Sequence, residues 1–137
     1  MGTRIALVDD EETVRVALAR VLKLAGFEVV TYATGEEFLA AFERSQPDCA
    51  LLDVHLPGMT GVQVQQRLQL DRVHMPAVFI TASEDPDVDS AVRDVGDFCV
   101  LRKPFSTRDL LDSIVTAMKD SRANQPKGQP PQRYTKS

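Results

Sequence analysis

Five short apolar segments, each followed by a stretch with helical periodicity, constrain the fold of this chain most strongly. The segments are RIALVD (4–9), EVVTY (28–32), CALLD (49–53), PAVFIT (76–81) and FCVL (98–101). Short apolar runs bounded by turn residues are typical of strands that are buried on both faces of a parallel sheet. Their alternation with helices predicts an α/β fold, a doubly wound five-stranded parallel sheet with right-handed crossovers and helices on both faces.

The helical stretches are bounded by residues that typically start or end helices. The expected N-caps are Thr34, Thr60, Asp85 and Ser106, and the expected terminating glycines are Gly26 and Gly96. Glu37 and Gln63 follow the first two caps by three residues, which is the spacing of a capping box. Pro86 is suited to the first turn of a helix.

The length and charge of the chain limit its organisation and its partners. With 137 residues, the chain can form one domain with a core. We expect that domain to span residues 1–120, followed at residues 121–137 by a disordered, basic tail or linker rich in proline and glutamine. The tail contains four basic residues and no acid, although the whole chain carries a net charge of −4. The domain is therefore acidic, which disfavours direct binding to nucleic acid.

No segment has the pattern of a membrane span or of a secretory signal. No apolar run approaches the roughly 18 residues that a spanning helix requires. The N-terminal sequence MGTRIALVDDEE turns acidic early, unlike a signal peptide. The two cysteines lie in apolar surroundings, which is consistent with a reducing compartment. We therefore expect a cytoplasmic protein without membrane attachment.

Polar residues with complementary chemistry follow four of the five predicted strands. Asp9 and Asp10 follow the first strand, Asp53 ends the third, Thr81 ends the fourth, and Lys103 follows the fifth. Each residue alone has an ordinary explanation, such as a helix-capping acid or a solvated loop charge. Ligands of open parallel sheets bind at the carboxyl ends of the strands, so these residues together predict a site at one edge of the sheet.

The predicted site has the chemistry of phosphoryl transfer. Three clustered carboxylates repel one another unless a cation compensates them, and Mg²⁺ is a cation that takes oxygen ligands. Lys103 and the hydroxyl of Thr81 can both contact a phosphoryl oxygen. Asp53 is then the candidate nucleophile, which would form an aspartyl phosphate.

Four motifs resemble those of a known family. They are LVDDE (7–11), LLDVHLPGMTG (51–61), FITAS (79–83) and LRKPF (101–105). Together they are similar to the receiver domain of bacterial two-component response regulators, over about residues 3–120. The phrases LPGMTG, MPAVFITA and KPF look most like the nitrogen-fixation type, whose receivers usually precede a LuxR-type helix-turn-helix.

The resemblance implies a flavodoxin-like receiver fold with strand order 2-1-3-4-5. Asp53 matches the phosphoacceptor of the family, Thr81 its switch hydroxyl and Lys103 the lysine that contacts the phosphoryl group. The implied donor is a sensor histidine kinase or a phosphotransfer protein. The implied role is signalling with only self-catalysed phosphotransfer and autodephosphorylation, rather than enzymatic turnover, and the output is another domain or a partner.

The resemblance also implies a metal site and a surface for self-association. Asp9 and Asp10 match the acidic pair of the family, and Mg²⁺ is expected on Asp10, Asp53 and the backbone carbonyl of His55. The surface formed by the fourth helix, the fifth strand and the fifth helix is the candidate dimer interface.

The fifth strand departs from the family pattern. Val100 stands where the family usually has an aromatic switch residue, and Cys99 stands where aspartate is common. Phe98 lies on the same face as Val100 but about 6–7 Å away along a strand. We therefore predict a weakened or rerouted switch.

Three other functions would use a similar fold or similar residues. A haloacid-dehalogenase-type hydrolase requires an acid two residues after the nucleophile, where this chain has His55. A flavin-binding module requires a phosphate-cradling loop, and Asp10-Glu11-Glu12 is electrostatically unsuited to phosphate. A receiver that docks without being phosphorylated is the main alternative, because of Val100.

Two smaller features have competing explanations. His55 is either a solvent-facing loop residue or a group that positions or blocks a hydrolytic water. Cys49 and Cys99 are predicted to be separated by two strand spacings, roughly 10 Å, which is too far for a disulfide. Both are therefore expected to be small core residues.

Overall fold

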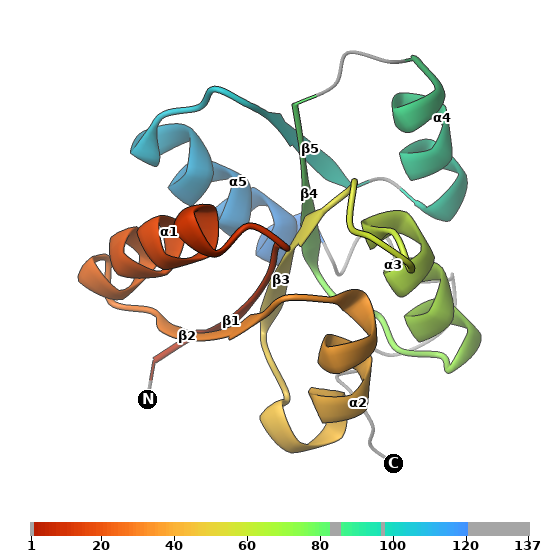
Figure 1. Ribbon diagram of the computed structural model, residues 1–137, viewed down its shortest axis with the longest axis horizontal. Coiled ribbons are helices and arrows are strands. Elements are labelled where there is room, and N and C mark those ends of the chain that lie inside the picture. The colour runs from red at the N-terminus through yellow and green to blue at the C-terminus, as the bar shows by residue number, and fades with distance from the viewer. Residues whose placement is uncertain (1, 83–85, 97, 121–137) are drawn as a thin grey trace.

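The computed structural model describes residues 2–82, 86–96 and 98–120, which form a parallel sheet flanked by helices (Figure 1). The strands are β1 (Arg4–Val8), β2 (Glu28–Tyr32), β3 (Cys49–Asp53), β4 (Ala77–Thr81) and β5 (Cys99–Arg102). The helices are α1 (Glu12–Leu24), α2 (Gly35–Ser45), α3 (Gly61–Leu70), α4 (Pro86–Val95) and α5 (Thr107–Asp120). The predicted alternation of strands and helices is confirmed.

The strand order is β2-β1-β3-β4-β5, and every neighbouring pair is parallel. This order confirms the expected flavodoxin-like fold. β3 lies at the centre of the sheet, and all of its residues are buried. Because the strands run in one direction, the residues that follow them gather at one edge.

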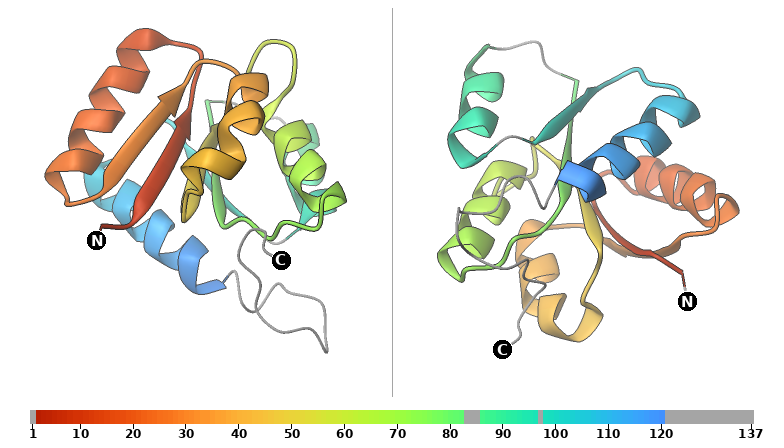
Figure 2. Two further views of the ribbon diagram at one scale, coloured as in Figure 1. Left: turned by 90° about the horizontal axis from the view of Figure 1, so that it is seen from below. Right: turned by 180° about the vertical axis from the view of Figure 1, so that it is seen from behind.

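The sheet is covered on both faces (Figures 1 and 2). Helices α1 and α5 lie on one face, and α2, α3 and α4 lie on the other. Side chains alternate between the two faces along a strand. In β3, Cys49 and Leu51 therefore join the core under α1 and α5, whereas Ala50 and Leu52 join the core under α2, α3 and α4.

Most of the predicted helix ends are confirmed. Thr60 and Gln63 form a complete capping box at the start of α3. The hydroxyl of Ser106 accepts a 3.0 Å hydrogen bond from the amide of Asp109 at the start of α5. α4 begins at Pro86, as predicted, while its expected cap Asp85 lies outside the described residues.

The start of α2 differs from the prediction in one bond. The hydroxyl of Thr34 accepts from the amide of Glu37 at 3.0 Å, as expected. The carboxylate of Glu37, however, accepts from the amide of Ala33 at 3.1 Å instead of closing the box on Thr34. The capping box predicted for α2 is therefore only partly formed.

Strand β5 is displaced by one residue from its predicted range of 98–101. Pairing with β4 begins at Cys99, which lies opposite Val78, and extends to Arg102. Phe98 precedes the strand, and its ring packs edge-to-face on Phe79 with the centroids 5.6 Å apart. Phe98 therefore packs on the core without belonging to the strand.

Two further predictions concern the C-terminal tail and attachment to a membrane. The expected tail, residues 121–137, lies outside the described residues. Among the helices that are described, none combines the length and hydropathy that a membrane crossing requires.

The close approach of α3 to β3 generates a stability prediction. A methyl group added at Gly61 would collide with the carbonyl oxygen of Asp53 and lie 3.3 Å from Cβ of Leu52. Gly61→Ala should therefore lower the free energy of unfolding by about 1–3 kcal/mol, as overpacking does. Urea denaturation measures this difference. Gln66→Ala, an exposed substitution in the same helix, is the control, and equal losses in both variants would contradict the prediction.

Candidate functional site

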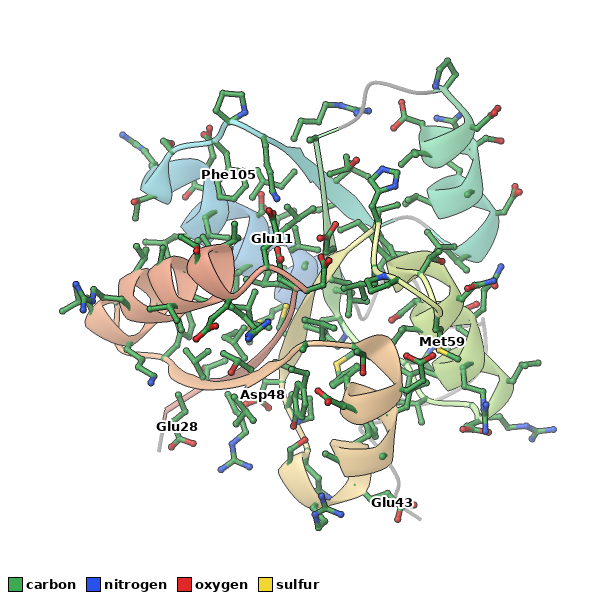
Figure 3. The ribbon with its side chains drawn as sticks, in the orientation of Figure 1. Glu11, Glu28, Glu43, Asp48, Met59 and Phe105 are labelled. Atoms are coloured by element: carbon green, nitrogen blue, oxygen red, sulfur yellow. The ribbon has the colours of Figure 1, made fainter. Side chains whose placement is uncertain are left out.

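The predicted site residues lie at the carboxyl edge of the sheet. Asp9 directly follows β1, Asp53 and Thr81 end β3 and β4, and Lys103 directly follows β5. Glu11, labelled in Figure 3, marks the point at this edge where β1 leads into α1. Residues far apart in the sequence are therefore adjacent in space because their strands end together.

Three carboxylates form a compact cluster at this edge. One oxygen from each of Asp9, Asp10 and Asp53 lies within 4.8 Å of the other two. Asp9 is 1% exposed and Asp53 is 8% exposed, whereas Asp10 is open to solvent. Two of the three carboxylates are thus buried away from water. Burying an isolated charged carboxylate is energetically costly.

Backbone amides fix one oxygen of each buried carboxylate. The amide of Glu11 donates to Oδ1 of Asp9 at 2.9 Å, and the amide of His55 donates to Oδ1 of Asp53 at 3.0 Å. In both cases the donor lies two residues after the acid, as in an Asx turn. The other oxygen of Asp9, Oδ2, is buried and has no hydrogen-bond partner.

Burial dominates the electrostatics of both buried acids. It raises the pKa of Asp9, opposed by the hydrogen bond from Glu11, and the charge of Asp53 raises it further. Burial likewise raises the pKa of Asp53, opposed by the hydrogen bond from His55 and by the charge of Lys103. The ionised cluster is therefore destabilising unless positive charge approaches it.

Thr81 and Lys103 complete the edge on the side of β4 and β5. The amide of Lys103 donates to the carbonyl of Thr81 at 2.9 Å, which joins the ends of the two strands. Lys103 is half-buried, and its charge lowers the pKa of both Asp9 and Asp53. Thr81 is 1% exposed.

Arg15 is a contributor that the sequence analysis missed. One terminal nitrogen of its guanidinium, Nη1, donates to the backbone carbonyl of Asp9 at 2.8 Å. This bond ties the loop after β1 to the first turns of α1. The sequence carries no signal for it, whereas the two amide contacts follow from the tendency of aspartate to accept from the amide two residues later.

The donor set fits a hard divalent cation. Carboxylate oxygens are the ligands that Mg²⁺ prefers, and a buried oxygen without a partner is a place where a cation would be stabilising. Oδ2 of Asp9 is such an atom. Asp10, Asp53 and the carbonyl of His55 are the other predicted ligands, and the amide of His55 already orients Asp53. The side chain of His55 is exposed, and a role of this residue in hydrolysis stays a prediction.

Neither cysteine belongs to the site. Cys49 is buried in β3 and Cys99 is half-buried in β5, and the two do not form a disulfide, as predicted. Burial raises the pKa of Cys49 to about 12, which keeps this thiol protonated and unreactive.

Comparison with known proteins identifies the family. The family model described as the response regulator receiver domain matches residues 5–115 of this chain. The chain belongs to this family. It is a receiver domain with the fold and signalling role that the four sequence motifs predicted.

Relatives and solved structures agree with this assignment. Sensory transduction protein RegX3 of Mycolicibacterium smegmatis is 35% identical over 92% of this chain and 55% of its own length. The Bacillus subtilis alkaline phosphatase synthesis transcriptional regulatory protein PhoP is 34% identical over 80% of this chain and 46% of its own. A CheY-like receiver domain protein from Methanospirillum hungatei superimposes with a TM-score of 0.81 and 27% identity, covering 90% of this chain and 98% of that one.

The chain spans about half the length of the curated relatives it matches. One of these relatives, PhoP, is a transcriptional regulatory protein. The nitrogen-fixation subtype stays a prediction, since the relatives named here do not single it out.

The raised pKa of Asp9 generates a prediction for stability against pH. Because the folded-state pKa lies above the unfolded value of about 3.9, the folded state binds more protons between these two values. The contribution of Asp9 to stability therefore falls as pH rises through this window. In chelator and at pH 7, Asp9→Asn should raise the urea midpoint of unfolding, and this gain should vanish below about pH 4.

The control for this experiment is Asp112→Asn, which removes an exposed carboxylate from α5. Such a surface change should alter the free energy of unfolding by less than about 0.5 kcal/mol. A gain from Asp9→Asn that persists unchanged at low pH would show that ionisation of Asp9 is not its cause.

Proposed function

We propose that Asp53 accepts a phosphoryl group from the phosphohistidine of a sensor histidine kinase or phosphotransfer protein. The observation that carries this proposal is the cluster at the end of β3, where Asp53 lies within 4.8 Å of two further carboxylates and under the charge of Lys103. Membership of the receiver family supports the same chemistry.

The chain's own residues supply orientation and charge for the transfer. An oxygen of Asp53 attacks phosphorus, the O–P bond forms as the P–N bond breaks, and the leaving imidazole takes up a proton from solvent. The His55 amide holds Oδ1 of Asp53, which leaves Oδ2 as the attacking atom. Lys103 then places its ammonium on a phosphoryl oxygen, and the hydroxyl of Thr81 donates to another.

We assign the metal site of this reaction to Asp9, Asp10, Asp53 and the backbone carbonyl of His55. Mg²⁺ bound there would neutralise the carboxylates and the incoming phosphoryl oxygens. The buried, unpartnered Oδ2 of Asp9 supports this assignment. Asp10, the exposed member, lies where a cation can enter from solvent.

The catalytic activity of the chain is limited to its own phosphorylation and dephosphorylation. A turnover hydrolase with an aspartate nucleophile requires a second acid two residues further on, and His55 occupies that position. Each cycle of phosphorylation and dephosphorylation releases phosphate. The signal is carried by the altered surface of the phosphorylated receiver.

We further propose that residues 1–120 form the receiver and that residues 121–137 are a tail or linker toward an output domain or partner. The half-length match to the curated relatives supports this division. A homodimer through the surface of α4, β5 and α5 is part of the proposal, because β5 is the edge strand on that side of the sheet.

A receiver that docks on a partner without phosphorylation is the second candidate. Val100 favours it, because this short, β-branched residue cannot swing inward as an aromatic side chain would. The intact cluster of Asp9, Asp10 and Asp53 favours phosphorylation.

The test of the proposed function is phosphorylation at one site. Incubation with acetyl phosphate and Mg²⁺ should add one phosphoryl group to the chain, measured by intact-mass spectrometry. Asp53→Asn should abolish this addition, and Asp112→Asn, an exposed carboxylate of α5, should retain it fully. Undiminished labelling of Asp53→Asn would remove Asp53 as the phosphoacceptor.

A second prediction concerns the metal alone. Since Mg²⁺ binds the assembled cluster of the folded state only, it should stabilise the fold by about 2.7 kcal/mol at a concentration one hundred times its Kd. Asp10→Ala should abolish the increase in melting temperature, and Glu43→Gln on the exposed face of α2 should not. Identical melting curves in chelator and in millimolar Mg²⁺ would contradict a site in the wild type.

A further inference from the structure

Helix α4 is tied to the rest of the domain by a polar contact near each end. Near its start, the carboxylate of Asp89 pairs with the guanidinium of Arg102 on β5. At its end, the backbone carbonyl of Val95 accepts from the side chain of Gln69 on α3 at 2.6 Å. Between them, the helix is seated on the core by buried valines, including Val92. The first contact is the one closer to the candidate site.

Arg102 adjoins the site through its neighbours. It lies opposite Thr81 in the register of β4 and β5, and the amide of the next residue, Lys103, donates to the carbonyl of Thr81. The charge of Lys103 acts on Asp9 and Asp53, while Arg102 pairs with α4. Two consecutive residues therefore connect the carboxylate cluster to the helix.

The aromatic residue on the same side of the chain as Arg102, Phe98, already packs against the core. Because side chains alternate between the two faces of a strand, Phe98, Val100 and Arg102 lie on the same side of the chain. The ring of Phe98 packs edge-to-face on Phe79, and a methyl group added at Gly96 would lie 2.8 Å from it. Val100 lies opposite Phe79. Of these three residues, Arg102 is the one at the end of the strand beside Thr81.

We propose that Arg102 is a positioning residue that transmits the state of the site to α4 through its ion pair with Asp89. This rests on the proposed function. When a phosphoryl group on Asp53 draws Lys103 inward, the backbone at the end of β5 shifts and the guanidinium of Arg102 shifts with it. The pair has side chains 38% and 32% exposed, so it is weak enough to break within such a transition.

The first measurement tests whether the pair holds α4. Hydrogen exchange of the α4 amides is followed by mass spectrometry in the full 137-residue chain without ligand. Arg102→Gln should accelerate exchange by about two- to fivefold, the range for a half-exposed ion pair. High salt should accelerate exchange of the wild type by screening the pair and should have little effect on the variant.

The second measurement tests transmission. Mg²⁺ and beryllofluoride, an analogue of the phosphoryl group, should change α4 exchange in the wild type, and Arg102→Gln should lose at least half of this change. Asp89→Asn should reproduce the loss, and the double variant should add nothing to it. Arg102→Lys, which keeps the charge, should restore much of the change. Arg93→Gln on the exposed face of α4 is the matched control and should behave as the wild type.

Binding of beryllofluoride is followed in every variant by its fluorine NMR signal. Undiminished binding by Arg102→Gln, together with a lost response of α4, is the result that supports the proposal. An α4 response equal to that of the wild type would overturn it. Absence of binding by the wild type would overturn the proposed function instead, while exchange without ligand would still report on the ion pair.

Discussion

The removal of two carboxylates from water at the end of the sheet is the constraint on which the rest of the site depends. Asp9 and Asp53 are nearly inaccessible, and burial is the largest influence on the pKa of each. The surrounding elements compensate this cost in part, with one amide hydrogen bond to each acid and the charge of Lys103. The compensation is incomplete, since both pKa values remain raised, and a bound cation would offset the surplus negative charge.

The fold maintains this cluster through backbone contacts. The amide of Gly61 at the start of α3 donates to the carbonyl of Val54 at 3.3 Å, and the capping box of Thr60 and Gln63 fixes the same turn. Only a residue without a side chain fits against the carbonyl of Asp53 there. The segment LPGMTG thus serves the geometry of the strand end, because its turn residues return the chain tightly to β3.

The sequence predicted those features whose causes are local or periodic. The run CALLD predicted β3 because a strand covered on both faces must be apolar throughout, and an aspartate at its end is visible at once. The capping box of Thr60 depends on residues three apart, and it was also predictable. The cluster of acids followed from the rule that parallel strands end at one edge.

Features set by the tertiary path of the chain could not be predicted in this way. The contact of Arg15 with the carbonyl of Asp9 depends on the angle between α1 and β1. The carboxylate of Glu37 accepts from the amide of Ala33, and the sequence pattern alone does not distinguish this amide from that of Thr34. The ring of Phe98 lies before β5 because Phe79 offers it a packing surface. Sequence position alone determines none of these orientations. The same holds for the pairing of Arg102 with Asp89, which the alternation of side chains along a strand permits but does not require. A weak polar contact of this kind can differ between two states at little cost, whereas the apolar packing of α4 on the core changes only with the helix as a whole.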